Sequence, residues 1–193
     1  MLSYKESLKI LKETNALLEG HFILSSGLHS SQYIQCAQLL SKPSQASQIC
    51  SSLAEKINKE FTKIDLILTP AIGGIVIGHE IGRLLNKETI FCERVNDDFV
   101  LRRGFNIAKK SNVLIVEDVI TTGKSSLQCS NLVLAAKANV LGYACVIDRS
   151  NGNSEIKSKI ISQLEINIPT YNKDNLPDSL KSIKAVKPGS RGL

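Results

Sequence analysis

VLIVEDVITTGKS, residues Val113 to Ser125, is the most informative segment of this 193-residue chain. It begins with four aliphatic residues, which predict a short strand buried on both faces. Glu117 and Asp118 end the apolar run, and a turn rich in hydroxyl groups follows them. Beyond the turn, apolar residues recur at i, i+3, i+4 and i+7, namely Cys129, Leu132, Val133 and Ala136. The segment therefore predicts a buried strand, a polar turn and a helix in succession.

The turn in this segment suits a phosphate group. Backbone N–H groups at a helix N-terminus and the helix macrodipole both favour negative charge. Glu117 and Asp118 would repel a bare phosphate, but in a sugar phosphate they can accept hydrogen bonds from ribose hydroxyls. A nucleotide-binding P-loop is excluded, because its first glycine would fall on Asp118. The alternative is an ordinary buried strand followed by a polar turn.

Two further apolar segments predict strands, and the turns that follow them are expected at the same edge of a sheet. Residues 64–68 form an apolar run, and the glycine-rich turn 69–74 separates them from a helical pattern at Ile77, Ile81, Leu84 and Leu85. Residues 143–147 form another apolar run, which ends at Asp148 and Arg149. Ligands of parallel α/β sheets gather at the carboxyl ends of the strands, so Arg149 is expected beside the central turn.

The remaining patterns predict scaffold and one hairpin. Helices are expected over residues 3–18 and 43–61, and strands over 89–93 and 164–168. Residues 21–35 predict two short strands around a turn that contains Gly27.

These stretches resemble the type I phosphoribosyltransferases, whose binding signature for phosphoribosyl diphosphate (PRPP) matches Val113 to Ser125. Within that family the chain resembles the orotate phosphoribosyltransferases, in which a hairpin of the form F-x-L-x-S-G, followed by an aromatic residue, covers the pyrimidine. The matching residues are Phe22, Leu24, Ser26, Gly27 and Tyr33. The resemblance implies an α/β domain with a mostly parallel central sheet flanked by helices. A small N-terminal hood is expected over residues 1–42 and the core over 43–193.

The resemblance also implies which residues bind substrate. PRPP contacts are expected from Glu117, Asp118, Val119, Ile120, Thr121, Thr122, Gly123, Lys124 and Ser125, from the diphosphate turn Ala71, Ile72, Gly73 and Gly74, and from Arg94. Orotate contacts are expected from Thr121, Arg149 and Ser25, and a guanidinium fork suits the orotate carboxylate. Ser25 and Gly73 stand where many relatives have a lysine, so the diphosphate turn must rely on backbone groups.

Residues 94–104, RVNDDFVLRRG, predict a polar, charged loop. Such connections are usually solvent loops. In the resembled family a mobile loop from the neighbouring subunit closes over the diphosphate, supplies cations and excludes water. The lysine and histidine usual in that loop have no clear match, so we expect Arg102 and Arg103 to supply the charge, with Asp118 as the further catalytic residue.

The implied reaction is transfer of a 5-phosphoribosyl group from PRPP to orotate in pyrimidine biosynthesis, as part of a homodimer. The transition state has oxocarbenium character and needs no covalent nucleophile, so the protein orients the reactants and stabilises charge. Mg²⁺ is expected as a cofactor, bound mainly through the diphosphate and the ribose hydroxyls, with no protein metal ligand.

Composition limits the class of protein. The five cysteines form no C-x-x-C pair and the N-terminus has no apolar signal segment, which favours a reducing cytoplasm and gives no sign of a membrane span. The net charge of +6 fits small anionic substrates, and the scattered basic residues and 5% aromatic content do not favour nucleic-acid binding. Three alternatives stay open: a purine phosphoribosyltransferase, a PRPP-sensing regulator, and an RNA-binding attenuator on the same fold.

Overall fold

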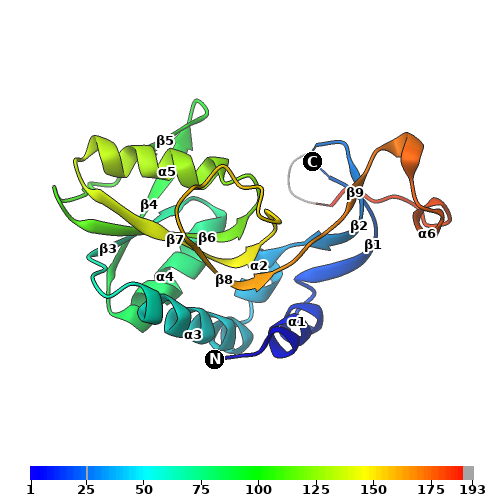
Figure 1. The fold of residues 1–193 in the computed structure, drawn as a ribbon, viewed down its shortest axis with the longest axis horizontal. Helices are drawn as coiled ribbons and strands as arrows, with labels where there is room; N and C mark the ends of the chain where they lie inside the picture. The colour runs from blue at the N-terminus through cyan, green and yellow to red at the C-terminus, as the bar shows by residue number, and fades with distance from the viewer. Residues whose placement is uncertain (25, 189–193) are drawn as a thin grey trace.

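The strands of the molecule form two separate sheets, one large and one small (Figure 1). The computed structural model describes residues 1–24 and 26–188. Its helices are α1 (Tyr4–Glu13), α2 (Cys36–Leu40), α3 (Pro43–Glu60), α4 (Gly73–Leu85), α5 (Lys124–Ala135) and α6 (Asp178–Lys181), with a 3₁₀ turn at Lys173–Asn175. Its strands are β1 (Leu17–Ile23), β2 (His29–Ile34), β3 (Leu66–Pro70), β4 (Glu88–Val95), β5 (Asp98–Leu101), β6 (Asn112–Ile120), β7 (Asn139–Asp148), β8 (Ile160–Glu165) and β9 (Thr170–Tyr171). Within these described ranges, no helix has the length and apolar character needed to cross a membrane.

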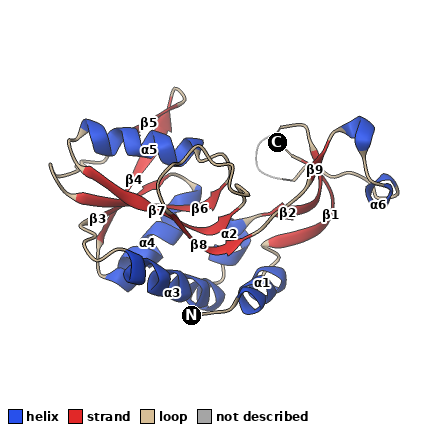
Figure 2. Cartoon of the chain, viewed as in Figure 1, coloured by secondary structure: helices blue, strands red, loops and turns tan. Residues whose placement is uncertain are grey.

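The large sheet has the strand order β5-β4-β3-β6-β7-β8. Its neighbouring strands are all parallel except β4 and β5, which confirms the predicted mostly parallel sheet. Helices α3 and α4 cover one face and α5 covers the other (Figure 2). This layering follows from β6, which is apolar on both sides: Leu114 and Val116 join the cluster under α3 and α4, whereas Val113 and Ile115 join the cluster under α5.

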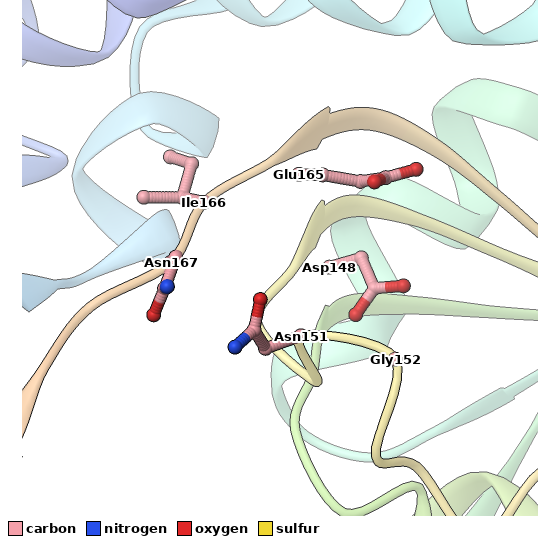
Figure 3. Close-up of a pocket in the computed structure, with 6 residues that line it drawn as sticks. All are labelled: Asp148, Asn151, Gly152, Glu165, Ile166 and Asn167. Carbon is pink, nitrogen blue, oxygen red and sulfur yellow. The ribbon is translucent and has the colours of Figure 1, made fainter.

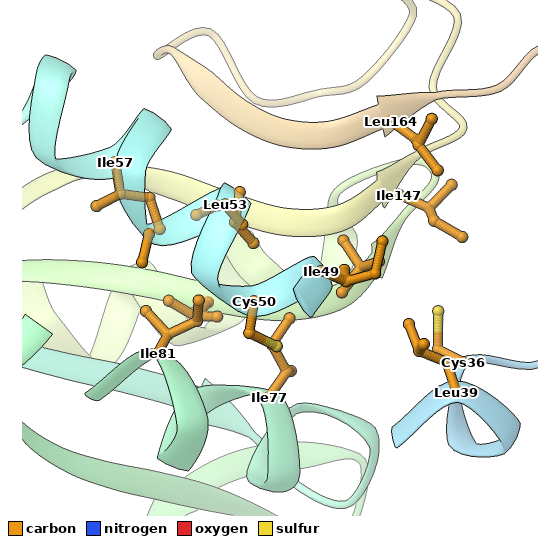
Figure 4. Close-up of a cluster of buried hydrophobic side chains, with 14 of the residues drawn as sticks. Cys36, Leu39, Ile49, Cys50, Leu53, Ile57, Ile77, Ile81, Ile147 and Leu164 are labelled. Atoms are coloured by element: carbon orange, nitrogen blue, oxygen red, sulfur yellow. The ribbon is translucent and has the colours of Figure 1, made fainter. Parts of the chain in front are cut away.

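The cluster under α3 and α4 fixes the platform on which the site is built (Figure 4). Ile49, Leu53 and Ile57 recur every four residues along α3 and are fully buried, as are Ile77 and Ile81 of α4. Full burial of such a side chain contributes about 1.5–3 kcal/mol, so these residues hold the two helices firmly on the sheet.

The small sheet is the hood, made of β1, β2 and β9. β1 and β2 pair as the predicted antiparallel hairpin, and β9 adds to the outer edge of β2. The C-terminal segment also returns to β1: Val186 N donates to the His21 carbonyl, and Ile23 N donates to the Val186 carbonyl, each at 2.8 Å. The expected boundary at residue 42 is therefore incomplete, because C-terminal residues belong to the hood as well.

Three predicted elements are wrong in their extent. The strand expected over residues 164–168 is β8, which runs from Ile160 to Glu165. Helix α1 ends at Glu13 instead of residue 18, because Asn15 takes a left-handed backbone conformation with φ of 57° and β1 begins at Leu17. Residues 94–104 are not one open loop. They include the end of β4 and all of β5, which pair as an antiparallel hairpin. Its turn residues Asn96 and Asp97 both have positive φ, as tight hairpin turns require.

Candidate active site

The three turns predicted to bind substrate lie at one edge of the large sheet. β3, β6 and β7 are parallel neighbours and end at Pro70, Ile120 and Asp148. Their carboxyl ends therefore point the same way, and the segments that follow them share one edge. The sequence prediction that these turns form a single site is consistent with this topology.

The turn after β6 forms a small cradle at the start of α5. Gly123 occupies the N-cap position with φ of 82°, and a Cβ there would lie 2.8 Å from the Ile156 side chain, so only glycine fits. Glu155 N donates to the Thr122 carbonyl at 2.8 Å and fixes the turn from outside. A cavity of about 50 Å³ is lined by Glu117, Val119, Thr121, Thr122, Gly123, Lys124 and Ser125. Gly123 at the N-cap gives α5 no side-chain cap, and Lys124 N makes only a long hydrogen bond, of 3.3 Å, to Thr122 Oγ1, so the cradle can present the start of this helix to an anion.

Glu117 and Asp118 lie at the end of β6, beside this cradle. Burial raises the pKa of Glu117 to about 7, although a hydrogen bond from Ser126 Oγ to Glu117 Oε2 acts in the opposite direction. Burial also raises the pKa of Asp118, whose Oδ1 accepts a hydrogen bond from Val119 N at 2.9 Å. Each of these half-buried carboxyl groups accepts one hydrogen bond from the protein and can accept more. The hydroxyl groups of a diol could donate the further hydrogen bonds.

The turn after β3 is the second turn expected to bind an anion. Ala71 N donates to the Cys92 carbonyl at 2.8 Å, and α4 begins at Gly73 without a side-chain cap. A Cβ on Gly73 would lie 3.0 Å from Asp118 Oδ2, so the two predicted turns meet at these residues. Ile72 is 86% exposed and Gly73 is exposed, so this part of the turn is accessible, whereas Gly74 is buried.

Arg149 joins the core to the hood. Its N–H donates to the Ile120 carbonyl at 2.8 Å, which places the residue directly beside the cradle. The side chain is half-buried, and its Nε has no hydrogen-bond partner among the described residues. Burial lowers the pKa of Arg149, and Tyr33 of the hood acts in the opposite direction. Tyr33 also packs against Phe22, with ring centroids 5.8 Å apart. A half-buried guanidinium group whose Nε donor is buried and unused favours an anionic ligand at this point.

The arginines of the β4–β5 hairpin have local partners. Arg94 donates to the Asp97 carbonyl and, at 3.1 Å, to Gln128 Oε1 of α5, and its guanidinium lies 4.3 Å from the centroid of Phe99. The sequence predicted Arg94 as a PRPP contact and gave no sign of this contact with α5.

The two arginines that follow β5 differ from each other. Arg103 pairs with Glu93 through two hydrogen bonds, of 2.8 and 3.1 Å, and lies over the Phe91 ring. Arg102 is exposed and has no ion pair within the described ranges. Ser25, the expected third orotate contact, lies outside the described residues.

A larger cavity of about 250 Å³ opens at the carboxyl ends of β7 and β8 (Figure 3). Asp148 and Glu165 lie side by side on these two strands, and Asn151, Gly152, Ile166 and Asn167 complete the lining. Its carboxylates disfavour anionic substrates, so the size of this cavity does not make it the substrate site.

Sequence reasoning missed Ser126, whose hydroxyl contacts Glu117. It follows the signature directly, but a serine in the first turn of a helix carries no signal of which carboxylate it meets in space. Tertiary packing of α5 on β6 supplies that contact.

Comparisons with known proteins match most of the chain. Residues 37–176 match the family model described as a phosphoribosyl transferase domain. The orotate phosphoribosyltransferase of Parvibaculum lavamentivorans is 45% identical over 189 residues, covering 96% of this chain and 97% of the relative. That of Sphingopyxis alaskensis is 46% identical over 184 residues, covering 94% of each chain. The crystal structure of orotate phosphoribosyltransferase from Aeropyrum pernix is 25% identical with a TM-score of 0.68, covering 82% of this chain and 92% of that one.

Proposed function

The chain belongs to the orotate phosphoribosyltransferases, within the phosphoribosyl transferase domain family, and from this premise we propose how its residues divide the reaction. The enzyme transfers the 5-phosphoribosyl group of PRPP to orotate, forming orotidine 5′-monophosphate and diphosphate in pyrimidine biosynthesis. The observation that carries the proposed division is the buried, unused Nε of Arg149 beside the cradle at the end of β6.

PRPP is held in three parts. The cradle from Thr121 to Ser125 takes the 5′-phosphate, because its N–H groups stand at the start of α5. Glu117 and Asp118 accept hydrogen bonds from the ribose diol, which offsets the desolvation that raises the pKa of each carboxyl. The turn from Ala71 to Gly74 takes the diphosphate at the uncapped start of α4.

Orotate lies between Arg149 and the hood. The Arg149 guanidinium donates to the orotate carboxylate and ring carbonyl, while Tyr33 and Phe22 cover the ring from the hood. Thr121 follows the end of β6 and lines the neighbouring cradle, from which it would contact the orotate ring. The reaction then needs orientation of the ring nitrogen toward the anomeric carbon, with charge stabilisation of the leaving diphosphate.

Mg²⁺ is the proposed cofactor. The donors at this edge fit an ion whose ligands come mainly from substrate, since the uncapped start of α4 can fix diphosphate oxygens and the two acids can fix ribose hydroxyls. When bound, Mg²⁺ supplies positive charge to the diphosphate as it leaves.

Two copies of the chain are proposed to share the site. Arg102 is exposed after β5 and is the free cation of that segment in the described structure, whereas Arg103 must leave Glu93 to reach a neighbour. Both arginines would reach the diphosphate of the second copy and exclude water there. The five cysteines are all free and buried, which supports a cytoplasmic protein.

A base-competition assay tests the function. Protein, Mg²⁺ and PRPP are mixed with orotate, uracil or adenine in separate reactions. Loss of orotate absorbance measures turnover of orotate, and turnover of uracil and of adenine is measured in the other two reactions. Turnover of orotate alone is expected. Turnover of adenine without orotate would favour a purine phosphoribosyltransferase, and PRPP binding without turnover of any base would favour a regulator.

A further inference from the structure

We propose that Ser126 is a positioning residue, whose hydroxyl holds the Glu117 carboxyl so that one oxygen faces the ribose diol of PRPP. This inference rests on the proposed function of Glu117. Ser126 Oγ donates to Glu117 Oε2, which leaves Oε1 for the ligand. Glu117 also lines the cradle cavity. Its Oε1, which Ser126 does not contact, is therefore the oxygen proposed to face the substrate.

The surroundings of Ser126 keep its hydroxyl in place. The residue is fully buried on the inner side of α5. One turn later, Ser130 Oγ donates to the Ser126 carbonyl at 3.1 Å and therefore accepts from the Tyr143 hydroxyl of β7 at 2.5 Å. The two serines thus fasten α5 to different strands, Ser126 to β6 and Ser130 to β7.

Ser126 is also the donor that favours the ionised form of Glu117. Burial raises the pKa of Glu117 to about 7, and Ser126 opposes that rise. Three other titratable groups surround Glu117: Asp118 on its own strand, Cys129 of α5 and Cys145 of β7. Two cations come near: Lys124 shares the cradle, and Arg94 of β4 acts on Cys129. Burial and Asp118 both raise the pKa of Glu117, and Ser126 lowers it. Loss of the Ser126 hydroxyl should therefore move the titration of Glu117 to higher pH.

The test is binding of PRPP with Mg²⁺ to the full chain, measured calorimetrically from pH 5.5 to 9. Wild-type affinity should rise with pH as Glu117 ionises. In Ser126→Ala the rise should shift to higher pH, so that affinity is about tenfold weaker at pH 7 and the gap narrows toward pH 9. The 5′-phosphate of PRPP titrates equally in all variants, so only the difference between variants is read.

Ser130→Ala is the matched control, because it removes a hydroxyl from the same face of the same helix without touching Glu117. It should lower thermal stability but leave the pH profile of binding unchanged. If Ser126→Ala folds poorly, Ser126→Cys fills the same space with a weak donor and takes the same readout.

An unshifted profile in Ser126→Ala or Ser126→Cys, or an equal shift in Ser130→Ala, overturns the inference. Either result leaves the proposed function standing as long as the wild type binds PRPP. Absence of PRPP binding to the wild type would instead overturn the proposed function itself.

Discussion

Gly73 and Asp118 face each other across the edge of the large sheet, so closely that a Cβ on Gly73 would lie 3.0 Å from Oδ2 and 3.1 Å from Oδ1 of Asp118. Gly73 starts α4, and Asp118 lies near the end of β6, 45 positions later in the chain. The proposed diphosphate turn and the proposed ribose acids are therefore in contact before any substrate arrives.

Gly73→Ala should weaken PRPP binding. The new methyl group crowds the Asp118 carboxylate, which is already fixed by Val119 N, so the carboxylate must shift by a few tenths of an ångström. We expect a several-fold rise in the KM for PRPP, about 1 kcal/mol, with little change in the KM for orotate. Steady-state kinetics with each substrate varied in turn measure both constants. A change confined to orotate would contradict the proposed placement.

Asp118→Asn should reduce turnover with the fold intact. Asparagine has nearly the same shape and can still accept from Val119 N, but it loses the charge next to the ribose. A fall in kcat of about 100-fold is expected if the carboxylate stabilises positive charge on the ribose in the transition state. Circular dichroism and thermal melting check the fold. Unchanged turnover would count strongly against the assignment of Asp118.

Arg149→Lys should raise the KM for orotate and spare PRPP. Lysine keeps the positive charge but cannot donate two parallel hydrogen bonds. We expect a rise of about 30-fold or more in the KM for orotate at saturating PRPP, and an unchanged or slightly higher melting temperature, because the unpaired buried Nε is removed. A larger effect on PRPP than on orotate would place Arg149 in the wrong subsite.

Glu117→Gln should stabilise the protein increasingly as pH rises. The pKa of Glu117 is raised from 4.5 to about 7 in the folded chain, so between these values the folded state keeps a proton that the unfolded state has lost. Wild-type stability is thus fully present below pH 4.5 and declines as pH rises to about 7, by at most about 3 kcal/mol. Glutamine does not ionise and escapes this loss. Urea denaturation at pH 4.5, 6 and 8 measures the difference, and a gap that does not grow with pH would contradict the burial of this carboxyl.

His21→Ala should loosen the C-terminal segment from the hood. His21 Nδ1 donates to the Ile183 carbonyl at 2.8 Å, and His29 Nδ1 donates in turn to His21 Nε2 at 2.6 Å. Without this chain of hydrogen bonds, limited trypsin cleavage after the exposed Lys184 should become several-fold faster. His79→Ala, on α4 and away from the hood, is the control. Equal cleavage rates in both variants would show that the histidine pair does not hold the segment.

Local patterns in the sequence were sufficient to predict most of the core. Apolar runs such as Val113 to Val116 and helical repeats such as Ile49, Leu53 and Ile57 predict elements because their period alone fixes which side is buried. The turn proposed to hold the 5′-phosphate could also be located from the sequence, since its residues from Glu117 to Ser125 are contiguous. Short-range turn chemistry was less reliable, as the left-handed Asn15 and the Asn96–Asp97 hairpin turn show.

The sequence by itself determined the succession of the main strands, turns and helices of the core and located the two turns proposed to bind anions, because these depend on neighbours a few positions apart. Only the tertiary structure decided which groups meet across the site: Gly73 with Asp118, Ser126 with Glu117, and Tyr33 with Arg149. It also brought β9 and Val186 into the hood. These contacts join residues from 9 to more than 160 positions apart, and their geometry is set by how the helices and the hood pack on the sheet, which no local pattern encodes.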